Sequence, residues 1–147
     1  MGFDVHVEID ASLGRVWDVL MDVESWPQWT TSMTTVTLLR PGPLALGDDV
    51  RIHQPKFGTL IWTVSELNAE SSFTWATHRS GITIIAEHRI GQLRPGVVLL
   101  TLEVHQSGRL SRLIEAVSKP VAQRYVQREA AGHKQHAEAV IESNSDC

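Results

Sequence analysis

The side chains best suited to proton transfer or metal binding in this 147-residue chain are its seven histidines. An imidazole changes charge near neutral pH, so it can move protons or coordinate a metal ion. His133 and His136 lie three residues apart near the end of the chain, a spacing that puts two side chains on one helix face. No HExxH, CxxC or two-histidine-one-carboxylate pattern accompanies them. The sequence therefore predicts no metal site, and a solvated helix face is the better interpretation of this pair.

Other catalytic patterns are missing from the sequence as well. It has no GxSxG motif and no glycine-rich phosphate loop. The single cysteine, Cys147, is the last residue, so it is a poor nucleophile candidate and has no partner for an internal disulfide. Most acidic residues fall in turns, at outward strand positions or on the polar face of the last helix, as in QREAAG. Neither a catalytic carboxylate pair nor a cofactor is predicted.

Composition limits the class of protein. An apolar fraction of 42% and a charged fraction of 20% are ordinary for a folded domain of this length. The net charge of −4 gives no basic surface for nucleic acid. The longest apolar runs have the length of a strand and are too short to span a bilayer, and no secretory signal begins the chain. We expect one domain over residues 1–147, located in the cytoplasm, with a disordered tail over 143–147.

Hydrophobic periodicity predicts the elements that must position the histidines. Residues 3–9 alternate apolar and polar side chains as a half-buried strand does, and residues 12–22 carry an apolar helical stripe with Ser12 as the N-cap. A short helical turn ends near Pro27. About eighty residues of strand pattern follow, broken by glycine, proline and asparagine. Residues 110–142 form one long helix, with a kink expected at Pro120 and a weak point at Gly132.

The order of elements predicts a curved sheet around a helix. An antiparallel sheet with one apolar face needs a cover, and the last helix is the only element large enough. A twisted sheet wrapped round one helix leaves space between them, because a cylinder does not fill a curved trough. The sequence thus predicts an apolar hollow between the sheet and the last helix.

Several stretches resemble the polyketide cyclase/dehydrase branch of the helix-grip (SRPBCC) superfamily, which is related to START lipid-transfer domains and birch-pollen-type allergens. These stretches are ASLGRVWDVLMDVESWPQW, GDDVRIHQPK, WTV, FTW, GITIIAEHRI and RYVQREAAGHKQHAE. The resemblance implies an α+β helix-grip fold: about seven antiparallel strands around a long C-terminal helix, with two short helices between strands 1 and 2. The resemblance indicates the fold more strongly than the activity, since the superfamily includes aromatase/cyclases, lipid and hormone carriers, dehydratases and cochaperone-type modules on one scaffold.

Strand parity predicts which side chains face the hollow. If Phe73 and Trp75 point inward, so does Thr77; if Ile84 points inward, so does His88. The predicted ligand-binding set is Trp29, Gln54, Trp62, Trp75, Thr77, Ile84, His88 and Tyr125.

The polar members of this set each have a second interpretation. His88 is the candidate catalytic acid or base, but it is also consistent with a satisfied structural histidine. Gln54 either contacts a ligand or satisfies backbone groups at a strand end beside Pro55. Tyr125 either presents its hydroxyl to the hollow or packs as helix core. Trp62 and Trp75 form core or cavity wall.

The segment DVESWPQWT places Trp26 and Trp29 at one end of the trough. Pro27 fixes the corner and disfavours helical geometry at Trp26. We expect Trp26 to plug the end of the trough as core. Trp29 either plugs it too or lines the cavity mouth.

Three functions follow from these expectations. The leading hypothesis is a binding protein for a hydrophobic small molecule, lipid-like or polyketide-like. The second is a polyketide cyclase/aromatase or dehydratase that uses His88 as acid or base. The third is a protein-interaction module with a filled core.

Overall fold

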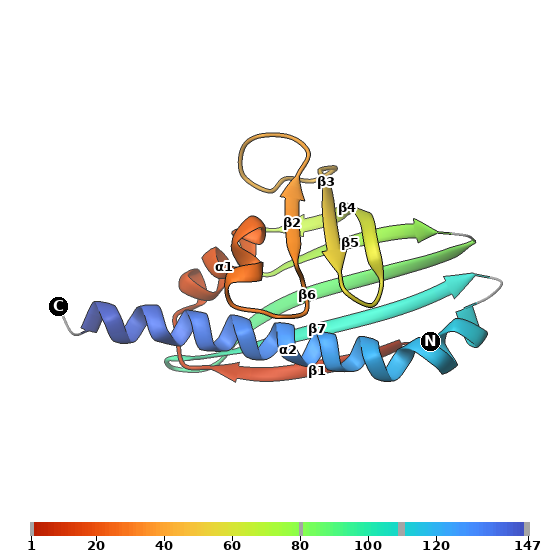
Figure 1. The fold of residues 1–147 in the computed structure, drawn as a ribbon. Coiled ribbons are helices and arrows are strands. Elements are labelled where there is room, and N and C mark those ends of the chain that lie inside the picture. Colours follow the sequence, from red (N-terminus) through yellow and green to blue (C-terminus); the bar gives the residue numbers. More distant parts are fainter. Residues whose placement is uncertain (1, 80, 109–110, 146–147) are drawn as a thin grey trace.

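The computed structural model describes residues 2–79, 81–108 and 111–145, apart from the side chains of 111–118 and 140–145. It contains seven strands, two α-helices and one 3-10 helix (Figure 1). In chain order these are β1 (Gly2–Ile9), α1 (Leu13–Met21), η1 (Val23–Gln28), β2 (Thr35–Leu38), β3 (Asp49–Gln54), β4 (Gly58–Asn68), β5 (Ser72–Arg79), β6 (Ile82–Arg94), β7 (Val97–Gly108) and α2 (Ser111–Ser145).

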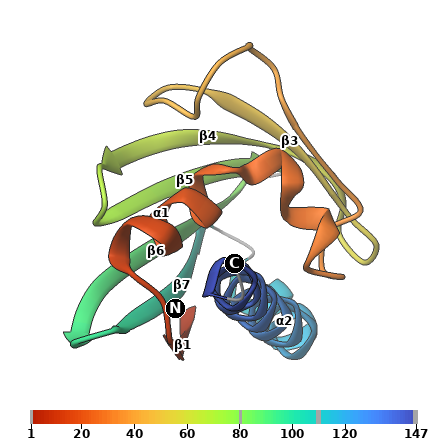
Figure 2. The ribbon, with the colours of Figure 1, turned by 90° about the vertical axis from the view of Figure 1, so that its left-hand side faces the viewer.

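All seven strands form one antiparallel sheet in the order β1-β7-β6-β5-β4-β3-β2. The sheet curves, and α2 lies in its concave side, as the view along the helix shows (Figure 2). The helices α1 and η1 cover the end of the trough, where α1 packs against α2 and η1 against β2. The predicted helix-grip architecture is confirmed, including the two short helices between the first two strands.

Strand parity is confirmed along the inner face of the sheet. Phe73, Trp75 and His88 are buried, whereas His78 and His105 are exposed. The register shifts once between Val64 and Glu66 and once between Gln92 and Arg94, and neither irregularity lies within the β5–β6 pairing that carries His88. The inner face is therefore continuous where it matters for the site.

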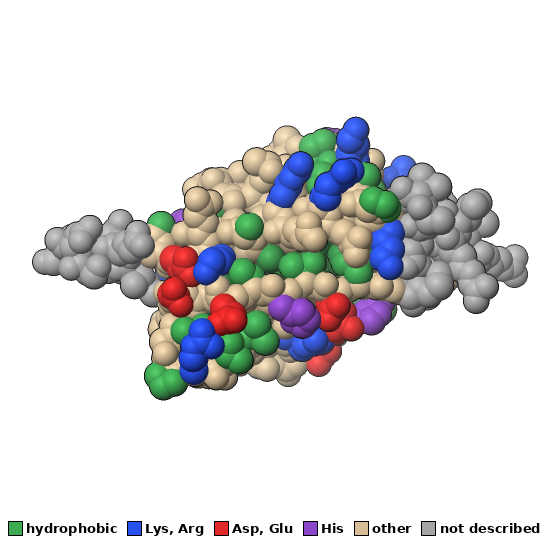
Figure 3. Space-filling model, turned by 90° about the horizontal axis from the view of Figure 1, so that it is seen from below, with side chains coloured by type: hydrophobic (Ala, Val, Ile, Leu, Met, Phe, Trp, Pro, Cys, Tyr) green, Lys and Arg blue, Asp and Glu red, His purple; other side chains and the backbone are tan. Residues whose placement is uncertain are grey.

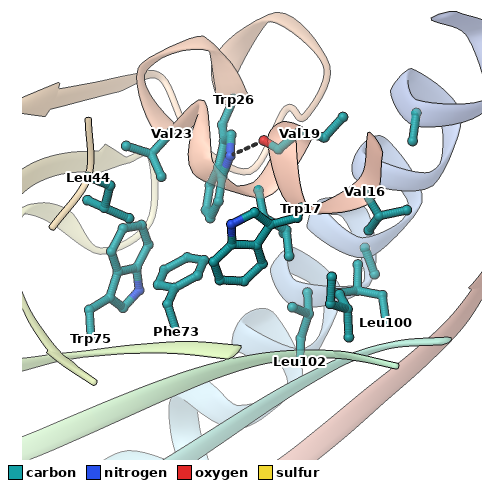
Figure 4. Packing of buried hydrophobic residues seen from close by; sticks show 14 of the residues in the cluster. Val16, Trp17, Val19, Val23, Trp26, Leu44, Phe73, Trp75, Leu100 and Leu102 are labelled. Atoms are coloured by element: carbon teal, nitrogen blue, oxygen red, sulfur yellow. Dashed lines mark hydrogen bonds between the residues drawn. The ribbon is translucent and has the colours of Figure 1, made fainter. Parts of the chain in front are cut away.

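The apolar stripe of α1 meets an aromatic cluster. The helix begins as predicted, because Ser12 Oγ accepts a hydrogen bond from the Arg15 N–H at 3.1 Å. Val16, Val19 and Leu20 are buried against the sheet. Figure 4 shows Trp26 beside Val19, with its indole N–H donating to the Val19 carbonyl at 3.2 Å. Trp26 is fully buried and touches Phe73 and Trp75, so it closes the end of the trough as predicted.

The long helix α2 is one element from Ser111 to Ser145 and continues through Pro120. Gly132, expected to weaken it, instead permits close packing: a Cβ at this position would lie 2.2 Å from the Trp29 carbonyl oxygen. No helix among the described residues is long and apolar enough to cross a membrane. Of the tail expected to be disordered, 143–145 belong to α2, and 146–147 lie outside the described residues.

Candidate functional site

A cavity of about 110 Å³ lies between the inner face of the sheet and α2. Its walls are mostly apolar, and six of the predicted ligand-binding residues line it: Gln54, Trp62, Trp75, Ile84, His88 and Tyr125. An apolar cavity of about 150 Å³ can hold one benzene molecule, so this space of about 110 Å³ is of the order of one small ring at most. The interior is therefore not packed solid, which removes the main argument for the filled-core alternative.

Two residues of the predicted set do not line this cavity. Thr77 is buried, but its hydroxyl donates to the Ile61 carbonyl at 2.7 Å and so serves the sheet. Trp29 is half-buried and donates its indole N–H to His133 Nδ1 at 3.0 Å. Its ring also stacks on His136, with centroids 3.9 Å apart and planes 5° apart. Trp29 thus lies behind the cavity wall rather than at its mouth.

His88 lies on the cavity wall, almost fully buried on β6. Its Nε2 lies 3.3 Å from Glu129 Oε2, and its Nδ1 lies 3.4 Å from the Phe73 carbonyl oxygen. The imidazole stacks on the Phe73 ring at a centroid distance of 4.1 Å, and the edges of Trp26 and Trp75 close the sides. The predicted inward position of His88 is correct, and the structure adds a carboxylate as its partner.

Glu129 was expected on the polar face of the last helix, and that expectation is wrong. The residue is buried, lines the cavity from α2 and contacts two histidines. Burial acts to raise the pKa of Glu129, but the contacts with His133 and His88 outweigh it and lower this pKa from 4.5 to about 2. The carboxylate is therefore ionised at neutral pH.

His133 was expected on a solvated helix face, and this is also wrong, because the side chain is completely buried. Its Nε2 lies 3.5 Å from Glu129 Oε2, and its ring packs edge-on against Trp26 at 4.6 Å. Burial lowers the pKa of His133 below its usual value, although Glu129 acts to raise it. Its helix neighbour His136 is only partly buried and stacks on Trp29 instead.

A sequence signal for these two residues exists in the helix spacing. Tyr125, Glu129 and His133 follow one another at intervals of four, so they share one helix face. Once Tyr125 is placed toward the sheet, Glu129 and His133 follow. Because Glu129 and His133 are polar, hydrophobicity alone assigns them to solvent, although both side chains are buried.

The β3–β4 turn and α2 form one part of the cavity wall. The Tyr125 hydroxyl accepts a hydrogen bond from the Lys56 backbone N–H at 3.2 Å, and the Phe57 ring meets the Tyr125 ring edge-on at 5.5 Å. Both aromatic residues line the cavity, together with Gln54. The Tyr125 ring thus packs, as the second of its two interpretations expected, and its hydroxyl fixes the turn.

An acidic group on the outer face of the sheet has its own explanation. Glu87, Glu103 and His105 lie close enough together to hold a metal ion. Arg89 already occupies the place of a cation, because its Nη1 lies 2.8 Å from Glu87 and 2.7 Å from Glu103. The ion pair with Arg89 lowers the pKa of Glu103. This group is consistent with a structural ion-pair network.

A second hollow is an open groove between β1 and α2, lined by Val5, Val7, Ala130 and Lys134 among others. Figure 3 views this side of the molecule and shows hydrophobic side chains along its middle with charged side chains around them. Lys134 Nζ donates to the Glu8 carbonyl at 2.7 Å, and Glu138 accepts from the Asp10 N–H at 2.9 Å. These bonds fasten α2 to the end of β1.

Comparison with known proteins identifies the class. The family model described as "Polyketide cyclase / dehydrase and lipid transport" matches residues 2–142, so the chain belongs to this family. No curated protein sequence is significantly similar to it.

Solved structures share the fold at low sequence identity. A START superfamily protein from Mycobacterium smegmatis is 15% identical with a TM-score of 0.71, covering 92% of this chain and 97% of its own. The Zhui aromatase/cyclase from Streptomyces sp. R1128 is 17% identical with a TM-score of 0.69, covering 97% and 93%. A hypothetical protein from Helicobacter pylori is 16% identical with a TM-score of 0.76, covering 92% and 86%. These likenesses establish the START-like fold.

Proposed function

We propose that this protein binds a small apolar molecule of about one ring, bearing one polar oxygen, in the cavity between the sheet and α2. The single observation that carries this proposal is an apolar cavity whose wall includes a buried His88–Glu129 pair. Ligand sites are mostly apolar with a few placed polar groups, and this cavity has that character. The ring would lie among Trp62, Trp75 and Ile84, with its oxygen at the pair.

The cavity volume limits the size of the lipid-like or polyketide-like ligand expected from the sequence. About 110 Å³ accommodates one ring or the end of a chain. We therefore favour a compact ligand. A cytoplasmic location and the lack of nucleic-acid binding stay predictions.

Calorimetric titration with p-cresol and with toluene tests this function. Both probes fit a one-ring cavity, but only p-cresol brings an oxygen to the His88–Glu129 pair. We expect wild-type protein to bind p-cresol more tightly than toluene. Ala86→Phe fills the cavity, because Ala86 lines it, and should abolish binding of both probes. Ile85→Phe places the same ring on the exposed outer face of the same strand and should leave binding unchanged.

Two results would contradict the proposal. The first is a wild-type protein that binds neither probe in calorimetry or in native mass spectrometry. The second is binding that persists in folded Ala86→Phe protein, since the probe would then occupy another part of the molecule.

Acid–base catalysis on a polyketide-type substrate is the second candidate function. The observation that favours it is the 3.3 Å contact between His88 Nε2 and Glu129 Oε2 on the cavity wall, which gives the imidazole a charged partner. His88→Ala should then abolish turnover of a linear poly-β-ketone while toluene still binds. Unchanged turnover in this variant would exclude the candidate.

A further inference from the structure

Four side chains form a connected series that ends at the cavity. Trp29 Nε1 lies 3.0 Å from His133 Nδ1, His133 Nε2 lies 3.5 Å from Glu129 Oε2, and the same oxygen lies 3.3 Å from His88 Nε2. Trp29 follows η1, His133 and Glu129 belong to α2, and His88 belongs to β6. The series therefore links three parts of the fold.

The Trp29 indole fixes the protonation of His133. An indole N–H is a donor and has no acceptor atom, so His133 Nδ1 must accept and carries no proton. The neutral imidazole then has its proton on Nε2, the nitrogen that faces Glu129 Oε2. The lowered pKa of His133 agrees with a neutral ring.

His88 has the opposite environment, since both of its nitrogens face acceptor oxygens. Nδ1 faces the Phe73 carbonyl and Nε2 faces the Glu129 carboxyl group. A neutral imidazole would leave one bare nitrogen against an oxygen, whereas an imidazolium has a proton for each. The parallel Phe73 ring 4.1 Å away also favours a cation, because the face of an aromatic ring attracts positive charge.

We infer that Trp29 and His133 are positioning residues that set the charge of the cavity: they hold Glu129 as a carboxylate and thereby keep His88 as an imidazolium. The proton could instead reside on Glu129, but an imidazole has a higher intrinsic proton affinity than a carboxyl group. His133 Nε2 lies 3.5 Å from the carboxylate without hydrogen-bond geometry, so the N–H dipole acts on this charge through space. A buried ion pair of this kind is tolerated because each charge compensates the other.

This inference rests on the proposed ligand site and narrows the class of ligand. A neutral ring hydroxyl can donate to the carboxylate and accept from the imidazolium. A ring that carries its own carboxylate would meet the charge of Glu129, while the charge of His88 is already compensated by that same Glu129. We expect 4-methylbenzoate to bind at least about tenfold more weakly than p-cresol, equivalent to about 1.4 kcal/mol.

Nitrogen-15 NMR of the histidine rings tests the charge assignment without any ligand. In wild-type protein near pH 7 we expect His133 as the neutral Nε2–H tautomer and His88 with protons on both nitrogens. Trp29→Phe keeps an aromatic ring but removes the donor, so His133 should shift toward the Nδ1–H tautomer or gain a second proton. Trp17→Phe makes the same change in a core tryptophan and should leave His133 as in wild type.

The wild-type spectra decide the inference even where a variant fails to fold. A charged His133, a proton on its Nδ1, or a neutral His88 would overturn it, as would a Trp29→Phe spectrum with an unchanged His133. Failure of the proposed function appears instead in the p-cresol titration, so the two failures are distinguishable. Equal affinity for p-cresol and 4-methylbenzoate would contradict the ligand class alone.

Discussion

At the residue scale, two buried histidines show how neighbouring atoms determine where an imidazole carries its protons. His88 and His133 are both buried and both contact the same Glu129 oxygen. They differ in the partner of the second nitrogen, which is a carbonyl for His88 and an indole N–H for His133. An acceptor stabilises a protonated nitrogen and a donor stabilises a bare one, so the two rings carry different proton requirements on Nδ1.

The buried His133 predicts a loss of stability in acid. Its folded pKa lies below the unfolded value of 6.5, so below pH 6.5 the unfolded chain binds more protons and the free energy of unfolding falls. Glu129 adds a second loss between its unfolded pKa of 4.5 and its folded pKa of about 2, amounting to about 3 kcal/mol. Urea unfolding from about pH 8 to about pH 2 covers both stages.

Two variants separate the contribution of His133 from general acid effects. His133→Gln removes the titrating ring, so stability should fall less between about pH 7 and pH 5 than in wild type. His78→Gln, on an exposed part of β5, should reproduce the wild-type profile. An identical fall in wild type and His133→Gln would show that this ring does not titrate as inferred.

The candidate site was predictable from the strands but not from the helix. A strand alternates every second residue, so Trp75, Ile84 and His88 could be placed on the inner face without knowledge of their partners. On α2 the inward face itself carries polar residues, and hydrophobicity therefore assigned Glu129 and His133 to solvent. Their burial depends on contacts with β6 and Trp29, which are remote in sequence and invisible to local pattern.

Where α2 meets the corner after η1, the two backbones lie unusually close together because Gly132 has no side chain. The Trp29 carbonyl occupies the space that a side chain at Gly132 would need. This approach brings the Trp29 indole to His133, one residue further along α2. The fold itself was predictable because strand order and helix length follow from periodicity, but this contact is a property of three-dimensional packing.

Gly132→Ala should destabilise the protein, although alanine is the better helix former. Helix propensity favours alanine by about 1 kcal/mol, but the new Cβ would lie 2.2 Å from backbone, so α2 must shift. We expect a net loss of about 1–3 kcal/mol in urea unfolding. Gly14→Ala is the matched control, because its Cβ would lie 3.8 Å from the nearest atom, the end of Glu70, and should be neutral or stabilising. A stabilised Gly132→Ala protein would refute the close packing.

The molecule as a whole combines a curved sheet with one long helix in its concave side. Trp26, packed against Phe73 and Trp75, fills one end of the trough, and the cavity lies beyond Trp75 beside Phe57 and Tyr125. Protein interiors are otherwise close-packed, so an unfilled space lowers stability relative to a filled one. A cavity that persists at this cost is consistent with a binding function, and the balance can be measured.

Filling the cavity from the helix side should separate stability from binding. Ala122 on α2 lines the cavity, and Ala122→Leu adds three carbons inside it, which should raise the free energy of unfolding by about 1–2 kcal/mol. The same variant should lose p-cresol binding because the added carbons occupy the space of the ring. Ala139→Leu, at an exposed position on α2, should change neither quantity. If Ala122→Leu binds p-cresol as wild type does, the ligand does not occupy this cavity; if it is strongly destabilised, the space is smaller than about 110 Å³ implies.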